Sequence, residues 1–375
     1  MTCKFTVIPV NCGDAFLLEK CEEKIIVDGG NNKEQLRKYL KYDTGIDEID
    51  IAVCTHNDAD HSKGILGLLE PCCDIKVKEV WLPGSWTYQL PLLLQCPDLF
   101  MKDVFCEYYN EKILTDNYLK QITCAEMRQG ELQEEKNFKL LDVVHQSPHL
   151  YPCLFSLIPH IKLPYASTYL AKLFHLAETI RNITIAAVSK GCLVRFFEHF
   201  DFGSHTCPWG GKNYLKPVNS IELTTLVTKP MTPLQYLRFL SRINRQSLVF
   251  YSPEAQTPGV FFCADSNLRF PILYPKPTRS IIVTAPHHGA DSCKESYNKI
   301  ATWAGNNIPI WVRSDHKCNR RPCKEYIALS NKYCTMCRVA SSPSKHKNNF
   351  SPKEAIVFTA NSGQWISANT ACKCR

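Results

Sequence analysis

The sequence predicts an α/β fold that is interrupted by a mostly helical insertion. In residues 1–84, short strand-like runs alternate with segments of helical spacing. Residues 85–219 are rich in Leu, Tyr, Phe and Cys and contain stretches of helical spacing. Strand-like runs return in residues 220–375. We therefore expect one α/β domain, built from 1–84 and 220–375, with the insertion at 85–219 between its two halves.

In the first half, turn signals and apolar periodicity separate the expected elements. The run 24–30 is a short apolar strand that ends in Asp-Gly-Gly, and NCGD is a turn signal between the two runs before it. The run 49–56 is apolar and β-branched, as in strands buried on both faces. The predicted strands are 4–10, 15–20, 24–30, 49–56 and 76–84, and the predicted helices are 33–43 and 61–70.

The later elements follow the same criteria. Residues 167–182 have the clearest helical spacing in the insertion. The last strand-like segment, 353–368, contains Asn361-Ser362-Gly363, which predicts a hairpin turn. The other predicted strands are 221–230, 246–252, 259–266, 279–289 and 308–315.

Composition narrows the class of protein. The chain has 375 residues, of which 45% are hydrophobic and 21% charged, so we expect a folded protein with a sizeable core. No apolar run reaches the roughly 18 residues that a membrane-spanning helix needs. The first ten residues enter a strand-like run without a signal-peptide layout. We therefore expect a cytoplasmic protein.

Charge and cysteines leave two questions open. The net charge is +8, and residues 301–375 carry 12 Lys and Arg against 3 Asp and Glu. This basic segment would attract anionic substrates such as phosphodiesters, or it is simply a solubilising surface. Most of the 20 cysteines are expected to be free thiols. The alternative is a structural zinc site on Cys318, Cys323, Cys334 and Cys337, for which the spacing is poor.

The strongest chemical signal is the stretch THNDADHS at residues 55–62. His56, Asp58, Asp60 and His61 are four metal-ligating side chains within six residues. They lie between a predicted buried strand and a predicted helix, where open α/β sheets place their sites. Imidazole and carboxylate groups together can bind one or two divalent ions. The alternative is a surface turn with capping polar residues, which such a dense set of ligands disfavours.

Three other predicted strands end in residues of the same chemistry. Asp265 follows the apolar run FFCA, and His287 and His288 follow IIVTAP. Asp28 ends the strand-like run at 24–30, although Asp-Gly-Gly is also an ordinary turn. Because the carboxyl ends of parallel strands share one edge of a sheet, these residues could meet the His/Asp stretch at one site.

Five ordered motifs resemble the metallo-β-lactamase superfamily, and more narrowly its ComEC-type hydrolase branch. The branch has a turn of the form S-H-x-D-A-D-H, as in THNDADH here, and a V-x-x-G-D-A segment, as in VNCGDA at 10–15. It also has N-x-x-S-L-V, as in NRQSLV, and P-H-H-G-S, as in PHHGA at 286–290. The closing strand and glycine are similar to VFTANSGQW. The resemblance covers about 1–84 and 220–368, without the branch's membrane channel.

The resemblance implies an αββα sandwich that binds two divalent metal ions, Zn or Mn. His56 and Asp58 would hold one metal, and Asp60, His61 and one of His287 or His288 the other. Asp265 would bridge the two, and Asp28 would orient a ligand histidine. In many superfamily members a histidine stands where this chain has Asp58, so the site is richer in oxygen, which favours Mn alongside Zn. Asp60 and Asp265 are the residues expected to be most directly catalytic.

Two departures from the family pattern concern the remaining ligands. Where the branch often has His-Pro, this chain has Lys229-Pro230 and, nearer its end, Arg321-Pro322. The central histidine ligand is therefore absent or supplied by another residue, for which His145 is the candidate. Lys229 and Arg321 are instead basic side chains that could bind a substrate phosphate.

Three functions are consistent with these features. The first is a hydrolase that uses a metal-bound hydroxide on phosphodiesters, and thus a nuclease acting on DNA or RNA. The second is a hydrolase of small carboxylic esters, lactones or thioesters, since one fold hosts many reactions. The third is a weakly active interaction protein that binds a protein partner through 85–219, for example as a subunit of a bacterial defence system.

Overall fold

The computed structural model confirms the α/β class, with a large mixed sheet and a smaller one. It describes residues 3–115, 137–138, 167–200, 202, 207–242, 247–315, 321–338 and 354–372. Nine strands form the large sheet in the order β17-β16-β1-β2-β3-β4-β5-β7-β9. From β3 to β7 these strands are parallel, and the others are antiparallel. The bounds are β1 Lys4–Val7, β2 Phe16–Lys20, β3 Glu23–Val27, β4 Glu48–Val53, β5 Lys76–Pro83, β7 Leu193–His199, β9 Ser220–Glu222, β16 Ile356–Asn361 and β17 Gln364–Ile366.

The smaller sheet has the strand order β15-β14-β13-β12-β11-β8. Its strands β12 to β15 are parallel, so their carboxyl ends lie at one edge. A separate two-stranded ladder pairs β6 (Asn137–Phe138) with β10 (Leu226–Val227). The bounds in the smaller sheet are β8 Lys216–Pro217, β11 Phe250–Ser252, β12 Val260–Phe262, β13 Ile282–Thr284, β14 Ile310–Arg313 and β15 Lys332–Cys334.

Three buried clusters hold these layers together. One joins the two sheets and includes the rings of Phe16 and Phe262, whose centroids are 6.3 Å apart. A second contains Ile26 of the large sheet with Leu36, Ile65 and other apolar side chains of the nearby helices. A third lies between the smaller sheet and the two helices after β13. The hydrophobic side chains of both sheets are therefore buried on two faces, which explains why their strands read as continuous apolar runs.

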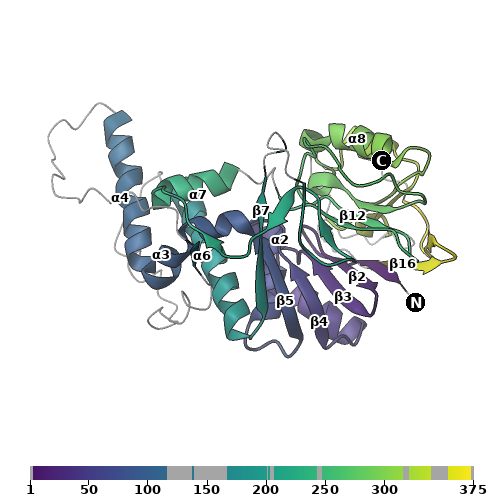
Figure 1. The fold of residues 1–375 in the computed structure, drawn as a ribbon, viewed down its shortest axis with the longest axis horizontal. Helices are drawn as coiled ribbons and strands as arrows, with labels where there is room; N and C mark the ends of the chain where they lie inside the picture. The colour runs from purple at the N-terminus through teal and green to yellow at the C-terminus, as the bar shows by residue number, and fades with distance from the viewer. Residues whose placement is uncertain are drawn as a thin grey trace, which may run out of the picture.

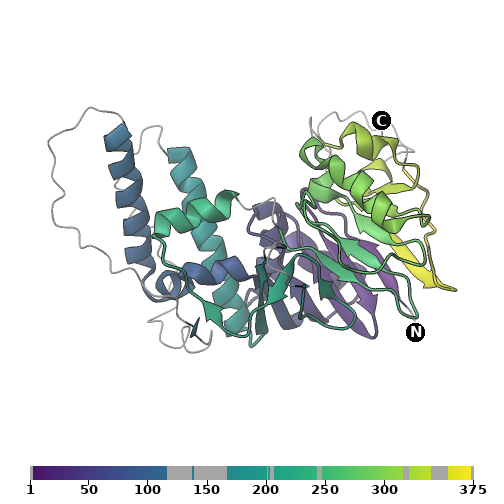
Figure 2. The same cartoon turned by 45° about the horizontal axis from the view of Figure 1, so that its top comes forward.

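The helices divide into two groups (Figures 1 and 2). In both views α3, α4, α6 and α7 gather at the end of the molecule away from α8. The α-helices are α1 Lys33–Lys38, α2 Ala59–Leu69, α3 Leu90–Gln95, α4 Pro97–Thr115, α6 Ser167–Ser189, α7 Pro233–Arg242, α8 Glu295–Ala304 and α9 Lys324–Ala328. A π-helix, Tyr39–Asp43, continues α1, and short 3-10 helices cover Gly84–Gln89, Pro286–Gly289, Asp291–Cys293 and Thr335–Arg338. In the described part of the chain, no helix combines the length and apolarity needed to span a membrane.

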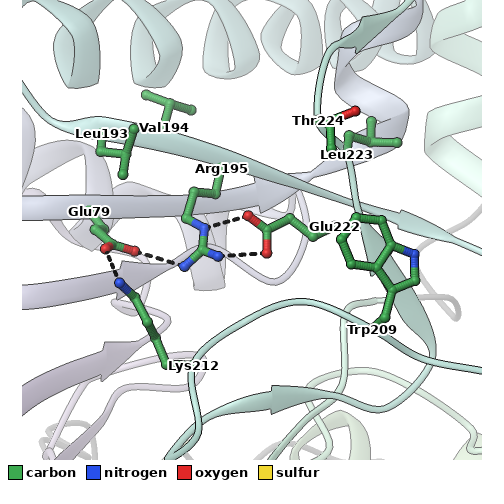
Figure 3. A pocket seen from close by; sticks show the side chains of 9 residues that line it. All are labelled: Glu79, Leu193, Val194, Arg195, Trp209, Lys212, Glu222, Leu223 and Thr224. Carbon is green, nitrogen blue, oxygen red and sulfur yellow. Dashed lines mark hydrogen bonds and ion pairs between the residues drawn. The ribbon is translucent and has the colours of Figure 1, made fainter.

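The predicted boundary of the helical insertion, 85–219, differs from the structure. Strand β7 lies inside this range, yet it pairs in parallel with β5 in the large sheet. Its charged residues explain the error, because Arg195 and Glu198 interrupt the apolar pattern of a buried strand. Arg195 is instead neutralised within the sheet: its guanidinium contacts both oxygens of Glu222 at 2.6 Å and Oε2 of Glu79 at 3.1 Å (Figure 3).

Candidate metal centre

The chain turns at the carboxyl ends of four strands place the His and Asp side chains together. Helix α2 begins directly after the turn that follows β4, with Asp58 at its N-cap. The Asp58 carboxylate does not cap the helix; its Oδ2 lies 3.7 Å from Nε2 of His56. Asp265 follows β12, and His287 and His288 follow β13. The predicted strand ends therefore meet, but across two sheets: β3 and β4 are parallel neighbours in the large sheet, and β12 and β13 are parallel neighbours in the smaller one.

Left-handed backbone conformations mark these same turns. Asp28, Ala264, His287 and His288 have φ values of 59°, 47°, 46° and 52°. Non-glycine residues rarely adopt this region, and each such residue costs about 1–3 kcal/mol. Strain of this kind persists only where the surrounding structure fixes the backbone, here at the turns that carry the His and Asp side chains and also at Cys21, Glu22, Leu268 and Ser362.

The first ligand group consists of His61, His288, Asp265 and Asp14, all of them buried. The Nε2 atoms of His61 and His288 lie 3.0 Å apart. Both point at Oδ1 of Asp265, at distances of 3.1 Å and 3.3 Å. Oδ2 of Asp60 lies 3.4 Å from His288 Nε2, so Asp60 stands at the more exposed side of this group. The ligand atoms of the group's four members are all within 4.8 Å of one another, which suits a single ion.

The second ligand group consists of His56, Asp58 and Asp265. Oδ2 of Asp265 lies 3.6 Å from His56 Nε2. The same oxygen lies 3.3 Å from Nε2 of His287, whose side chain is partly exposed. Asp265 therefore offers one oxygen to each group, which is the arrangement of a carboxylate that bridges two ions.

Two other carboxylates contact the Nδ1 atoms of His61 and His288, on the side of each ring away from the centre. Asp28 Oδ2 lies 2.7 Å from His61 Nδ1, and this carboxylate also accepts hydrogen bonds from the Thr55 main chain and hydroxyl. His61 is thereby held with Nε2 toward Asp265, as expected of a residue that orients a ligand. Asp14 Oδ1 lies 3.0 Å from Nδ1 of His288. Asp14 was missed by the sequence analysis, although it belongs to the VNCGDA motif.

Three buried atoms of the ligand groups fit the presence of a divalent cation. His56 Nε2 and Asp265 Oδ1 face the centre, Asp14 Oδ2 belongs to the carboxylate behind His288, and among the described residues none of the three has a hydrogen-bond partner. Buried polar atoms of this kind are costly unless a partner completes them. Imidazole nitrogens with carboxylate oxygens are donors for Zn²⁺ and, as the oxygen share rises, for Mn²⁺. The cluster is therefore compatible with metal binding.

The opposite charges of the cluster lower the pKa of Asp265 and raise the pKa values of His56 and His288. Burial raises the pKa of Asp265, but His61 and His288 lower it well below its ordinary value. Burial lowers the pKa of His288, yet Asp14 and Asp265 raise it to about 10. Burial and His61 lower the pKa of His56, but the nearby carboxylates of Asp265 and Asp58 raise it to about 9. In the metal-free protein, protons on the imidazoles neutralise the carboxylates.

These shifts predict that metal binding releases protons. The pKa values of His56, His61 and His288 are all raised above 7, so at pH 7 an incoming ion must displace a proton from each. We expect about three protons released per chain when both ligand groups are filled, and an affinity that rises with pH at least to about pH 10, the pKa of His288. Calorimetric titration with Zn²⁺ in buffers of different ionisation enthalpy measures this release. A binding enthalpy that is the same in every buffer would contradict it, and His175→Ala, an exposed histidine on α6, should match the wild type.

The two basic residues predicted to bind phosphate, Arg321 and Lys229, differ in their distance from the cluster. Arg321 is close enough to His287 to help lower its pKa, after the larger effect of burial, and its Nη1 lies 3.1 Å from Asp315 Oδ2. Lys229 instead donates to the Tyr88 hydroxyl at 2.6 Å, and that hydroxyl donates to Glu198. No described contact joins Lys229 to the cluster. His145 lies outside the described residues.

His199 is a second residue that the sequence analysis missed. It ends β7 and, with His56, lines a cavity of about 10 Å³, room for about one water molecule. The hydroxyls of Ser85 and Ser247 line it too, and among the described residues they have no hydrogen-bond partner. Burial lowers the pKa of His199 to about 4, so its ring is neutral at pH 7. The sequence feature that could have revealed His199 is a histidine near the end of an apolar run. It was overlooked because the segment around it was predicted to be helical.

The cysteine alternative is only partly described. Cys323 and Cys334 are buried free thiols. Cys318 lies outside the described residues, and the side chain of Cys337 is not described. Across the described parts of the chain, the groups that could hold a metal consist of His and Asp alone.

A larger cavity of about 520 Å³ lies elsewhere, on β5, β7 and β9 (Figure 3). It is lined by the Glu79–Arg195–Glu222 ion pairs, Lys212 and the exposed indole of Trp209, and by no residue of the two ligand groups.

The chain matches no known family model and no curated protein sequence. A functional assignment therefore depends on the His/Asp cluster itself.

Proposed function

We propose that this protein is a metal-dependent hydrolase of the metallo-β-lactamase type, acting on phosphodiesters such as DNA or RNA. The five ordered motifs support the family. The three buried clusters support the αββα sandwich, because one joins the two sheets and the others pack helices against each of them. The observation that carries the proposal is that two His/Asp ligand groups share Asp265.

Each ligand group would hold one divalent ion, Zn or Mn. His56, Asp58 and Asp265, with His287 nearby, would form one site. His61, His288 and Asp265, with Asp60 nearby, would form the other. The roles match those the resemblance implies, except that both late histidines take part, one beside each group.

The residues of the chain prepare this site for an anionic substrate. Bound divalent ions would acidify a water molecule and polarise a phosphoryl oxygen. Asp28 holds His61 in one orientation, so no reorganisation is needed when the ligands are used. Asp58, Asp60 and Asp265 would offset three of the four charges of two divalent ions, and Asp14 and Asp28 add two carboxylates behind His288 and His61. A phosphodiester would therefore be bound by direct coordination of its oxygens to the ions rather than by net positive charge.

Arg321 supports a phosphate rather than a neutral ester as substrate. Its positive charge is felt by His287 at the exposed side of the second ligand group. Its Nη1 already lies 3.1 Å from Asp315 Oδ2, so a phosphate would share this guanidinium with the Asp315 carboxylate. A neutral lactone or ester would gain nothing comparable from it.

Hydrolysis assays with two classes of substrate test the proposal. Purified protein loaded with Zn²⁺ or Mn²⁺ is given bis(p-nitrophenyl) phosphate, single-stranded DNA and RNA, and in parallel a lactone. We expect metal-dependent phosphodiester cleavage that falls by about 10²–10⁴-fold in His61→Ala, because a ligand that must hold the metal is lost. His175→Ala is the matched control, since His175 is exposed on α6. Cleavage of the lactone but not of any phosphodiester would exclude the proposed substrate class.

A further inference from the structure

We propose that Asp14 is the positioning residue for His288, acting as the counterpart of Asp28 for His61. This inference rests on the metal binding in the proposed function and gives a role to a residue of the VNCGDA motif to which none was assigned. Asp14 Oδ1 lies 3.0 Å from His288 Nδ1, and both side chains are almost fully buried, at 1% and 0% exposure. On the other side of the ring, Nε2 faces Asp265 at 3.3 Å and Asp60 at 3.4 Å.

The contact decides which nitrogen of His288 is available. A carboxylate accepts a proton, so Nδ1 is the donor and Nε2 keeps its lone pair for the centre. Asp28 and His61 have the same arrangement, with the carboxylate at Nδ1 and Nε2 directed at Asp265. Each of the two histidines in the first ligand group therefore has its own carboxylate behind it. An imidazole whose far nitrogen is held in this way presents a fixed direction and a more basic lone pair.

Asp14 is itself held by a segment far along the chain, Arg313–Ser314–Asp315, where β14 ends. Ser314 Oγ donates to the Gly13 carbonyl at 2.9 Å and accepts from the Ala15 amide at 3.2 Å. The Gly13 amide donates to Asp315 Oδ1 at 3.1 Å. Arg313 donates from Nε to the carbonyl of His288 at 2.7 Å, so one segment fixes both members of the pair.

Gly13 brings this turn onto the metal-binding helix. It has φ +96°, and a Cβ there would lie 1.6 Å from the Asp60 carbonyl oxygen. The turn that carries Asp14 thus packs directly on the backbone of a ligand residue. Its position relative to α2 is fixed, which is what a residue that aims His288 at the centre requires.

Metal affinity in a double-mutant cycle tests the inference. The dissociation constant of Zn²⁺ is measured by competition with a chromophoric chelator for the full-length wild type, Asp14→Ala, His288→Ala and the double variant. We expect Asp14→Ala to weaken Zn²⁺ binding by about 10–100-fold. If Asp14 acts through His288, the double variant should bind no more weakly than His288→Ala alone. Asp14→Asn, which keeps an acceptor for Nδ1, should recover part of the loss.

The visible spectrum of the Co²⁺-loaded protein gives a second readout. We expect the ligand-field bands to change in Asp14→Ala, since His288 no longer has one orientation, and to be unchanged in Asp50→Ala. Asp50 is also largely buried, but it pairs with Lys78 and the Lys24 amide, and it belongs to neither ligand group. Thermal unfolding in EDTA identifies any variant that does not fold. If Asp14→Ala does not fold, the metal affinity and spectrum of Asp14→Asn are compared with those of the wild type instead.

The outcomes separate this inference from the proposed function. If the wild type binds neither Zn²⁺, Mn²⁺ nor Co²⁺, the metal centre and the role of Asp14 both fail. If the wild type binds metal but Asp14→Ala matches it in affinity and spectrum, only the role of Asp14 is wrong. A further loss in the double variant beyond His288→Ala would also overturn it, since Asp14 would then bind the metal itself or support the fold.

Discussion

Replacing Asp265 with alanine is expected to remove metal from both ligand groups at once. One oxygen of Asp265 faces His61 and His288, and the other faces His56 and His287. Losing this carboxylate deprives each site of a charged ligand and leaves the histidines without the anion between them. We expect fewer than about one tightly bound ion per chain and at least about a 10³-fold loss of metal-dependent hydrolysis.

Metal analysis after gel filtration and the phosphodiester assay measure the two effects. Asp291→Ala is the matched control, because this aspartate lies close in sequence to the cluster but its side chain is 71% exposed. Two bound ions and wild-type activity in Asp265→Ala would show that the carboxylate does not bridge the ligand groups. If Asp265→Ala keeps both ions but loses activity, Asp265 would act in the hydrolysis step and not in metal binding.

Gly64→Ala is expected to disturb the site from a distance through the backbone. A Cβ at Gly64 would lie 1.9 Å from the Gly29 carbonyl oxygen, so α2 would have to move away from the turn after β3. That turn carries Asp28, and α2 carries His61, whose ring it holds at 2.7 Å. We expect the free energy of unfolding to fall by about 1–3 kcal/mol, although alanine favours a helix over glycine by about 1 kcal/mol.

Urea unfolding of the metal-free protein and Zn²⁺ titration measure the two consequences. Zn²⁺ affinity should fall together with stability, because the separation of His61 from Asp28 changes. Lys63→Ala is the matched control on the same helix, since Lys63 is exposed. Equal unfolding free energies for Gly64→Ala and the wild type would mean that the two backbones can separate without cost.

The parts of the fold that depend on local pattern could be predicted from the sequence. The strands β3 and β4 and the helix α2 follow from apolar runs, and the α/β class is confirmed. That a buried His/Asp cluster could hold a metal also followed locally, because four ligands stand within six residues beside a strand. The close approach of α2 shows why Gly29 is needed in the Asp-Gly-Gly turn, and the φ of +72° and the nearby Val10 side chain show why Gly30 is needed, whereas the sequence left this turn ambiguous.

Asp14 and His199 could not be found in the same way, for different reasons. Asp14 follows glycine in a turn, where aspartate is ordinary, and its partner His288 lies 274 residues later. Nothing near Asp14 in the sequence signals that pairing. His199 ends a strand in which Arg195 is neutralised by Glu79 and Glu222 from neighbouring strands, and Glu198 accepts a hydrogen bond from Tyr88. Such compensation across a sheet is invisible to a pattern read along one segment.

The Arg313–Ser314–Asp315 segment has a consequence for how the protein is made. The Gly13 amide and the Asp315 carboxylate that it contacts are 302 residues apart. During synthesis, Asp28 and His61 emerge long before Asp265, His288 and this segment. The centre therefore cannot be complete until Arg313–Ser314–Asp315 has been made, and contacts of such long range form slowly. Metal loading is expected to follow the synthesis of this segment, and a chain that stops before Asp315 should retain the first ligands without a stable site.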